Sequence, residues 1–107
     1  MITVKTDLRS YILIKGHAGY APAGQDIVCA AVSTLYETLK RALPKCVVKA
    51  ITENEKVSVI KITPDPIIRW REEEEARDYL NFFLTGIEAL EQAYPQHVQL
   101  YRAIKRA

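Results

Sequence analysis

The first part of the chain alternates apolar and polar residues. Ile2 to Thr6 follows this pattern, and Tyr11 to Lys15 is a second short run that is rich in apolar and β-branched residues. Runs of this length and composition are typical of β-strands, whose side chains point to opposite faces in turn. Asp7 to Ser10 supply the turn between them, so residues 2–15 are predicted to form a β-hairpin.

A helical pattern begins after Asp26. Apolar side chains then recur three or four positions apart, at Val28, Ala31, Val32, Leu35, Leu39 and Leu43. Asp26 is a favourable N-cap, and Pro44 ends the pattern because proline cannot continue a helix. We therefore expect a helix from Ile27 to Leu43.

The second half of the chain repeats this order of elements. Cys46–Thr52 and Val57–Ile62 are strand-like and are separated by a polar turn. From Glu72 an apolar stripe with helical period predicts a second helix, which ends near Tyr94. Residues 96–107 fit either a short helix or a terminal strand followed by a frayed end.

The element order β-β-α-β-β-α predicts an α+β fold in one domain that spans residues 1–107. We expect an antiparallel four-stranded sheet with the two main helices packed on one face. The other face of such a sheet is left open to solvent. An open face of this kind suggests that it is buried between two copies of the chain in a homodimer.

Composition restricts the partners and the compartment. Fifteen Lys and Arg against thirteen Asp and Glu give a formal charge of +2, so a nucleic-acid partner is not expected from net charge. The sequence shows neither a leader pattern at Met1–Asp7 nor a long uncharged apolar run, which predicts a cytoplasmic protein without a membrane partner. The two cysteines, Cys29 and Cys46, are too few for a disulfide framework or a thiolate zinc site, so no metal or cofactor is expected.

The candidate chemistry lies between Gly16 and Ser33. His17 ends a predicted strand, and Cys29 falls in the first turn of the predicted helix, where unpaired backbone N–H groups favour a thiolate. The segment between them contains Gly19 and Gly24 and is predicted to be a flexible loop beside a substrate cleft. The pair therefore suggests a thiol nucleophile with an imidazole acid and base.

Each of these residues also has a purely structural explanation. A cysteine is often buried as a small apolar residue, and a histidine at a strand end often binds a backbone carbonyl. Asp26 either caps the helix only or also orients His17, as the acid of a triad does. Ser33 lies one helical turn after Cys29 and either contributes to the site or bonds to the carbonyl of its own preceding turn.

Gly16-His17-Ala18, Gly24 and the run from Asp26 to Ser33 together resemble the motifs of the ribosomal-processing cysteine protease family, also called the Prp or YsxB-like family. The resemblance implies that His17 and Cys29 are a catalytic dyad and that the enzyme is a homodimer. It also implies a substrate. The family removes the N-terminal extension, an aromatic-rich extended peptide, from the precursor of large-subunit ribosomal protein twenty-seven.

A different class of function is also open at this point. Lys40, Arg41, Lys45, Lys49 and Lys61 could form an RNA-binding surface. The alternative to a protease is therefore a catalytically inactive or retargeted dimer of the same fold that associates with ribosomes or RNA.

Overall fold

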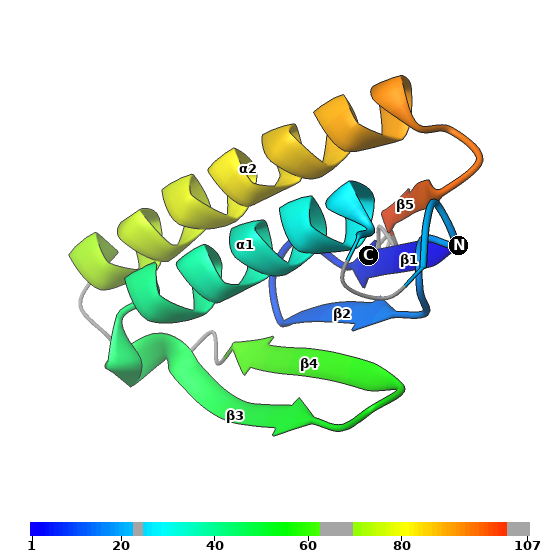
Figure 1. Cartoon of the computed structure of the whole chain (residues 1–107). Helices are drawn as coiled ribbons and strands as arrows, with labels where there is room; N and C mark the ends of the chain where they lie inside the picture. Colours follow the sequence, from blue (N-terminus) through cyan, green and yellow to red (C-terminus); the bar gives the residue numbers. More distant parts are fainter. Residues whose placement is uncertain (23–24, 63–69, 103–107) are drawn as a thin grey trace.

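The computed structural model describes residues 1–22, 25–62 and 70–102. Its elements, in chain order, are β1 (Ile2–Thr6), β2 (Tyr11–Lys15), α1 (Ile27–Ala42), the short 3-10 helix η1 (Lys45–Val47), β3 (Val48–Glu53), β4 (Val57–Ile62), α2 (Trp70–Ala93) and β5 (Val98–Arg102). Figure 1 shows the two long helices side by side above the sheet.

The sheet differs from the prediction in the number and direction of its strands. It has five strands in the order β3-β4-β2-β1-β5, and β5 runs parallel to β1. The predicted antiparallel four-stranded sheet was therefore wrong. Residues 98–102 are a strand, one of the two alternatives left open for the tail, while residues 103–107 lie outside the described part of the chain.

The fifth strand was hard to predict because its partner is remote in sequence. Ile2 pairs with Val98 and Val4 with Leu100, and the whole of α2 is part of the connection that brings β5 alongside β1. Parallel strands need such a crossover, which leaves no turn signal next to either strand. A short alternating segment gives no information about which strand it joins.

The local predictions were more accurate. The bounds of β1, β2 and β4 are those predicted, and Leu43 is the C-cap of α1 rather than its last residue. The predicted strand over Cys46–Thr52 begins later, because Pro44 leads into η1 and the strand β3 starts at Val48. The predicted second helix begins at Trp70 and ends at Ala93.

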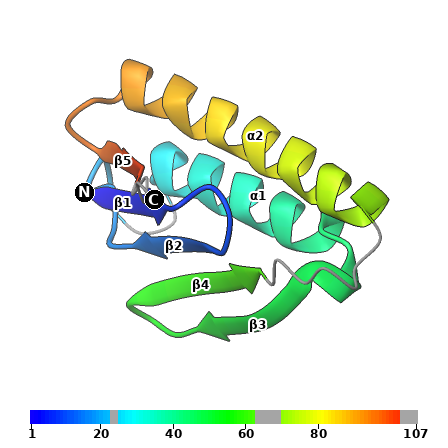
Figure 2. The same cartoon turned by 180° about the vertical axis from the view of Figure 1, so that it is seen from behind.

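The core lies between the two helices and one face of the sheet (Figures 1 and 2). Val4, Ile12 and Ile60 from the sheet are fully buried, as are Val28 from α1 and Ile87 from α2. The buried positions of β1 alternate with partly exposed ones, as a sheet with one covered face requires. Both helices lie on the same face, as expected, and within the described residues no helix covers the opposite face of the sheet.

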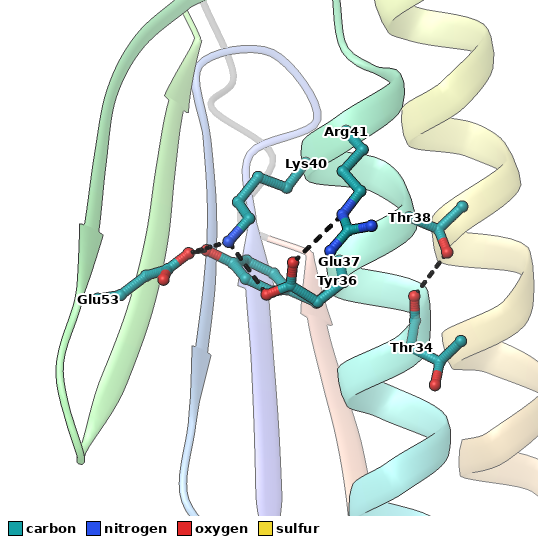
Figure 3. Close-up of polar contacts among 7 residues, drawn as sticks. All are labelled: Thr34, Tyr36, Glu37, Thr38, Lys40, Arg41 and Glu53. Carbon is teal, nitrogen blue, oxygen red and sulfur yellow. Dashed lines mark hydrogen bonds and ion pairs between the residues drawn. The ribbon is translucent and has the colours of Figure 1, made fainter.

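Helix α1 contacts both of its neighbours closely. Gly86 of α2 faces the Leu35 side chain, which a Cβ at position 86 would meet at 2.9 Å, so the small residue lets the two helices approach. On the other side, the Tyr36 hydroxyl donates to Glu53 of β3 at 2.8 Å, and Lys40 bonds the same carboxylate (Figure 3). Among the described residues, no helix is long and apolar enough to cross a bilayer.

Candidate active site

Gly16 sets the position of His17 at the end of β2. Its φ is +90°, a conformation that favours glycine, and a Cβ there would lie 2.3 Å from the backbone oxygen of Met1. The chain can therefore turn away from the sheet against the start of β1 only without a side chain at this position. His17 follows directly and is exposed.

Replacing Gly16 by alanine is expected to destabilise the protein by at least about 2 kcal/mol. The alanine would have to adopt a positive φ, and its Cβ would also clash with the backbone of Met1. Urea denaturation measures this loss. Gly19→Ala is the matched control, since Gly19 also has a positive φ of 66° but nothing lies within 4 Å of a Cβ there. An equal loss in the two variants would contradict the role assigned to the close approach at Met1.

Asp26 places Cys29 in the first turn of α1. One carboxylate oxygen, Oδ1, accepts the backbone N–H groups of Val28 at 3.0 Å and Cys29 at 2.9 Å, so Asp26 is the predicted N-cap. Cys29 is therefore the third residue of the helix, close to the positive end of the helix dipole. Its side chain is partly buried, whereas the other thiol, Cys46, is exposed.

The second oxygen of Asp26 holds the preceding loop. Oδ2 accepts the backbone N–H groups of Tyr20 at 3.1 Å and of Ala21 at 3.5 Å. The hydrogen bond from the Cys29 N–H is the main cause of the lowered pKa of this carboxyl. Partial desolvation acts in the opposite direction, and the N–H groups of Tyr20 and Ala21 lower the pKa further. Among the described contacts, none joins Asp26 to His17, so the proposed orienting role stays a prediction.

Changing Asp26 to Asn is expected to lower the melting temperature at neutral pH. Asparagine caps helices well, but its single oxygen cannot serve both the helix and the loop. Because the pKa of Asp26 is lowered in the fold, its stabilisation is complete above the ordinary carboxyl value of 3.8 and is lost as the pH falls through the lowered pKa. Melting curves of both proteins across the acid range should therefore converge.

Ala18 links the thiol to the far end of the chain. Its backbone N–H donates to the Cys29 Sγ at 3.3 Å, and its carbonyl oxygen lies 2.8 Å from Nδ1 of His97. A carbonyl only accepts, so Nδ1 of His97 carries the proton in this bond. Ala18 itself is buried, and these two bonds fix its backbone beside the sulfur.

His97, which follows α2 and lies 79 positions from Ala18, was not predicted from the sequence. The packing of Tyr20 was not predicted either. Its ring lies edge-on to Tyr94 and to His97, each with ring centroids 5.4 Å apart. The one available signal was that His97 is one of only two histidines in the chain. The loop therefore packs against a small aromatic cluster, which consists of Tyr20, Tyr94 and His97.

Two hollows meet at the predicted pair. A larger one of about 550 Å³ and a smaller one of about 260 Å³ are both lined by His17, Cys29 and Ser33. The first also includes Gly19 and Asp26, while the second extends toward the β3–β4 turn. The structure thus brings every described candidate residue to one place on the surface, between α1 and the end of β2.

Ser33 and the glycines have different outcomes. The Ser33 hydroxyl forms no hydrogen bond with a described residue, unlike Thr34, which bonds the carbonyl of its own preceding turn at 2.8 Å. Ser33 lines both hollows, with a hydroxyl that has no partner among the described residues. Gly19 has a φ of 66° and open space around it, whereas Gly24 lies outside the described residues.

This arrangement provides the groups needed for thiol chemistry. A sulfur at a helix N-terminus accepts a backbone N–H, and an exposed imidazole lines the same hollows. The described hydrogen bonds do not include one between the His17 ring and Cys29, although such catalytic bonds often tighten only around a substrate. No group of three or more potential metal ligands occurs among the described residues.

The family model described as "Cysteine protease Prp" matches residues 1–99. A search of curated proteins finds no match. Nearly the whole chain therefore fits one family, although no curated relative adds to that assignment.

Solved structures with the same fold include an essential ribosomal processing protease Prp from S. aureus with a covalently linked product peptide. It is 22% identical, has a TM-score of 0.77, and the match covers 95% of this chain and 99% of that one. The same protease with a substrate peptide gives a TM-score of 0.72 at 22% identity and the same coverage. SMU.848 from Streptococcus mutans is 28% identical, with a TM-score of 0.74 over 98% of this chain and 96% of that one.

Proposed function

Because the chain belongs to the cysteine protease Prp family, we propose that it removes the N-terminal extension of a ribosomal protein precursor, that of large-subunit ribosomal protein twenty-seven, in the cytoplasm. The observation that carries this proposal is the shared position of His17 and Cys29. Both line the same two hollows, and the sulfur accepts the N–H of Ala18 at 3.3 Å.

In the proposed reaction the Cys29 thiolate attacks the carbonyl carbon of the scissile peptide bond. His17, which has taken the thiol proton, returns it to the leaving amine as the carbon–nitrogen bond breaks. A thioester remains on Cys29. His17 then removes a proton from water, whose oxygen attacks the thioester, and the proton passes to the departing sulfur.

The Ala18 N–H is our candidate for stabilising the charge that develops during the attack. The negative charge develops on the oxygen of the carbonyl carbon that bonds to the sulfur, so a donor already at the sulfur is close to it. The N–H groups of Val28 and Cys29 at the start of α1 are occupied, because they already donate to Asp26. His97 and Asp26 support the proposed donor, because His97 binds the carbonyl of Ala18 and Asp26 holds the chain two residues later at Tyr20.

The substrate is tested by mass spectrometry of a ribosomal precursor incubated with the protein. We expect one cleavage within the extension and none in a precursor with a scrambled extension of the same composition. Cleavage of both precursors at equal rates would contradict a sequence-selective processing role. Absence of cleavage in the intact precursor, with turnover of other peptides, would reject this substrate while leaving the protease assignment in place.

We further propose that the chain acts as a homodimer, as the resemblance to the family implies. The uncovered sheet face, which first suggested the contact, carries lysines, so two copies facing each other there would bring like charges together. Phe82 on α2 is 77% exposed and offers apolar surface instead. Light scattering should give a dimer mass for the protein and a monomer mass for Phe82→Glu, whereas a monomer mass for both would reject the proposal.

A further inference from the structure

The uncovered face of the sheet combines basic and aromatic side chains. Because paired residues share a face, the strand register places Lys5 beside Tyr101, Lys61 beside Tyr11, and Lys15 beside Thr3. The ammonium group of Lys5 lies 5.8 Å from the centre of the Tyr101 ring. This face is opposite to the one that the helices cover. Its hollows do not include Cys29, although Lys15 at its edge also lines the smaller hollow at Cys29.

Two further hollows lie on this face and meet at Tyr11. One of about 730 Å³ is lined by Lys5, Lys15 and Tyr101, and the other, of about 510 Å³, by Lys49 and Lys61. Tyr11 lines both, so they form a continuous band across the sheet. Tyr101 is 45% exposed at one end of this band.

The charge on the band is of one sign. The strand positions that share this face hold no acidic residue in the described part of the chain, and its four lysines, Lys5, Lys15, Lys49 and Lys61, have no carboxylate partner among the described residues. The net charge of the chain is only +2, because acidic residues lie elsewhere. Local charge therefore points to an anionic partner that the net charge conceals.

The structure also divides the basic residues that the sequence grouped together. Lys40 pairs with Glu37 at 3.0 Å and with Glu53 at 2.8 Å, and Arg41 lies 3.8 Å from Glu37 (Figure 3). These side chains are partly neutralised within the protein. Lys49 and Lys61 instead line the band.

We propose that this band, defined by Tyr11, Tyr101, Lys5, Lys15, Lys49 and Lys61, binds single-stranded RNA. Lysines along a groove contact phosphates, and exposed aromatic rings stack on unpaired bases. Thr3 and Gln99, which are paired between the strands on this face, can bond the 2′-hydroxyl that distinguishes RNA from DNA. A second copy of the chain is a poorer occupant, because its own lysines would oppose these.

Binding is measured by fluorescence anisotropy of a labelled single-stranded RNA of mixed sequence at several salt concentrations. We expect the affinity to fall steeply as the salt concentration rises. A plot of the logarithm of the association constant against the logarithm of the salt concentration should become steeper by about 0.7 for each phosphate contacted. A single-stranded DNA of the same sequence and vesicles containing anionic phospholipid are the competing ligands. Weaker binding to both supports the proposal, and equal or tighter binding to either overturns it.

Tyr101 is tested by a pair of substitutions. Tyr101→Leu should weaken RNA binding about tenfold, since it removes one stacking surface, whereas Tyr101→Phe, which keeps the ring, should bind like the wild type. Equal affinities for the leucine variant and the wild type would reject the stacking role. Tyr101 lies outside the hollows shared by His17 and Cys29, so peptide cleavage should be unchanged in both variants.

The lysines are tested by a charge-matched comparison. Lys49→Gln/Lys61→Gln should reduce the salt slope by about 1.4, the value for two lost phosphate contacts. Arg41→Gln/Lys45→Gln removes the same charge outside the band and should leave the slope unchanged. Equal effects of the two pairs, or no RNA binding at low salt, would overturn the proposal. Both outcomes are independent of the cleavage assay, so they do not depend on the proposed protease substrate.

Discussion

Peptide cleavage is expected to fall by about 10⁴-fold or more when Cys29 is replaced by alanine, because the change removes the thiolate that forms the covalent intermediate. The structure supports this expectation through the position of the thiol. Asp26 caps the helix that begins with Ile27, and the Ala18 N–H donates to the sulfur. Removing the sulfur leaves the hollows and the surrounding bonds largely in place, so the effect should appear in kcat rather than in stability.

The matched control for this prediction is the other thiol. Cys46 is exposed, belongs to η1 and lies outside both hollows that Cys29 lines. Cys46→Ala should keep full activity in the same peptide assay, monitored by mass spectrometry. Residual activity of Cys29→Ala close to that of the wild type would remove Cys29 from the mechanism.

Replacing His17 by alanine should reduce kcat by about 10²- to 10⁴-fold, the usual contribution of a general acid and base. His17 is exposed and follows Gly16, so its imidazole supports no part of the core and its loss should leave the melting temperature unchanged. The variant should also alkylate more slowly at Cys29 when it is treated with iodoacetamide at neutral pH, because a nearby imidazolium favours the thiolate.

A double variant separates a catalytic pair from two independent effects. If His17 and Cys29 act as one unit, the double alanine variant should be no slower than Cys29→Ala alone. His97→Ala offers a second comparison, since His97 binds the Ala18 carbonyl and not the proposed reacting atoms. If the His97 variant loses alkylation reactivity and the His17 variant keeps it, the role proposed for His17 belongs to His97 instead.

The proximity of the candidate residues could be predicted from the sequence because they follow one another along the chain, while their catalytic roles stay a prediction. The N-cap Asp26, the helix that it begins and the strand that ends before His17 all depend on short-range patterns. Because His17 and Cys29 are only twelve residues apart, a single short loop connects these two elements. Family membership agrees with the motif that this segment contains.

The sequence by itself thus determined the two hairpins, the two helices and the pair of residues at the larger hollow. Only the tertiary structure decided that β5 joins β1 in parallel, that His97 and Tyr94 support the loop, and that unpaired lysines share one face with Tyr11 and Tyr101. The physical reason is separation along the chain. Local periodicity and capping act over a few residues, whereas these contacts join segments that meet only after the sheet and helices have packed together.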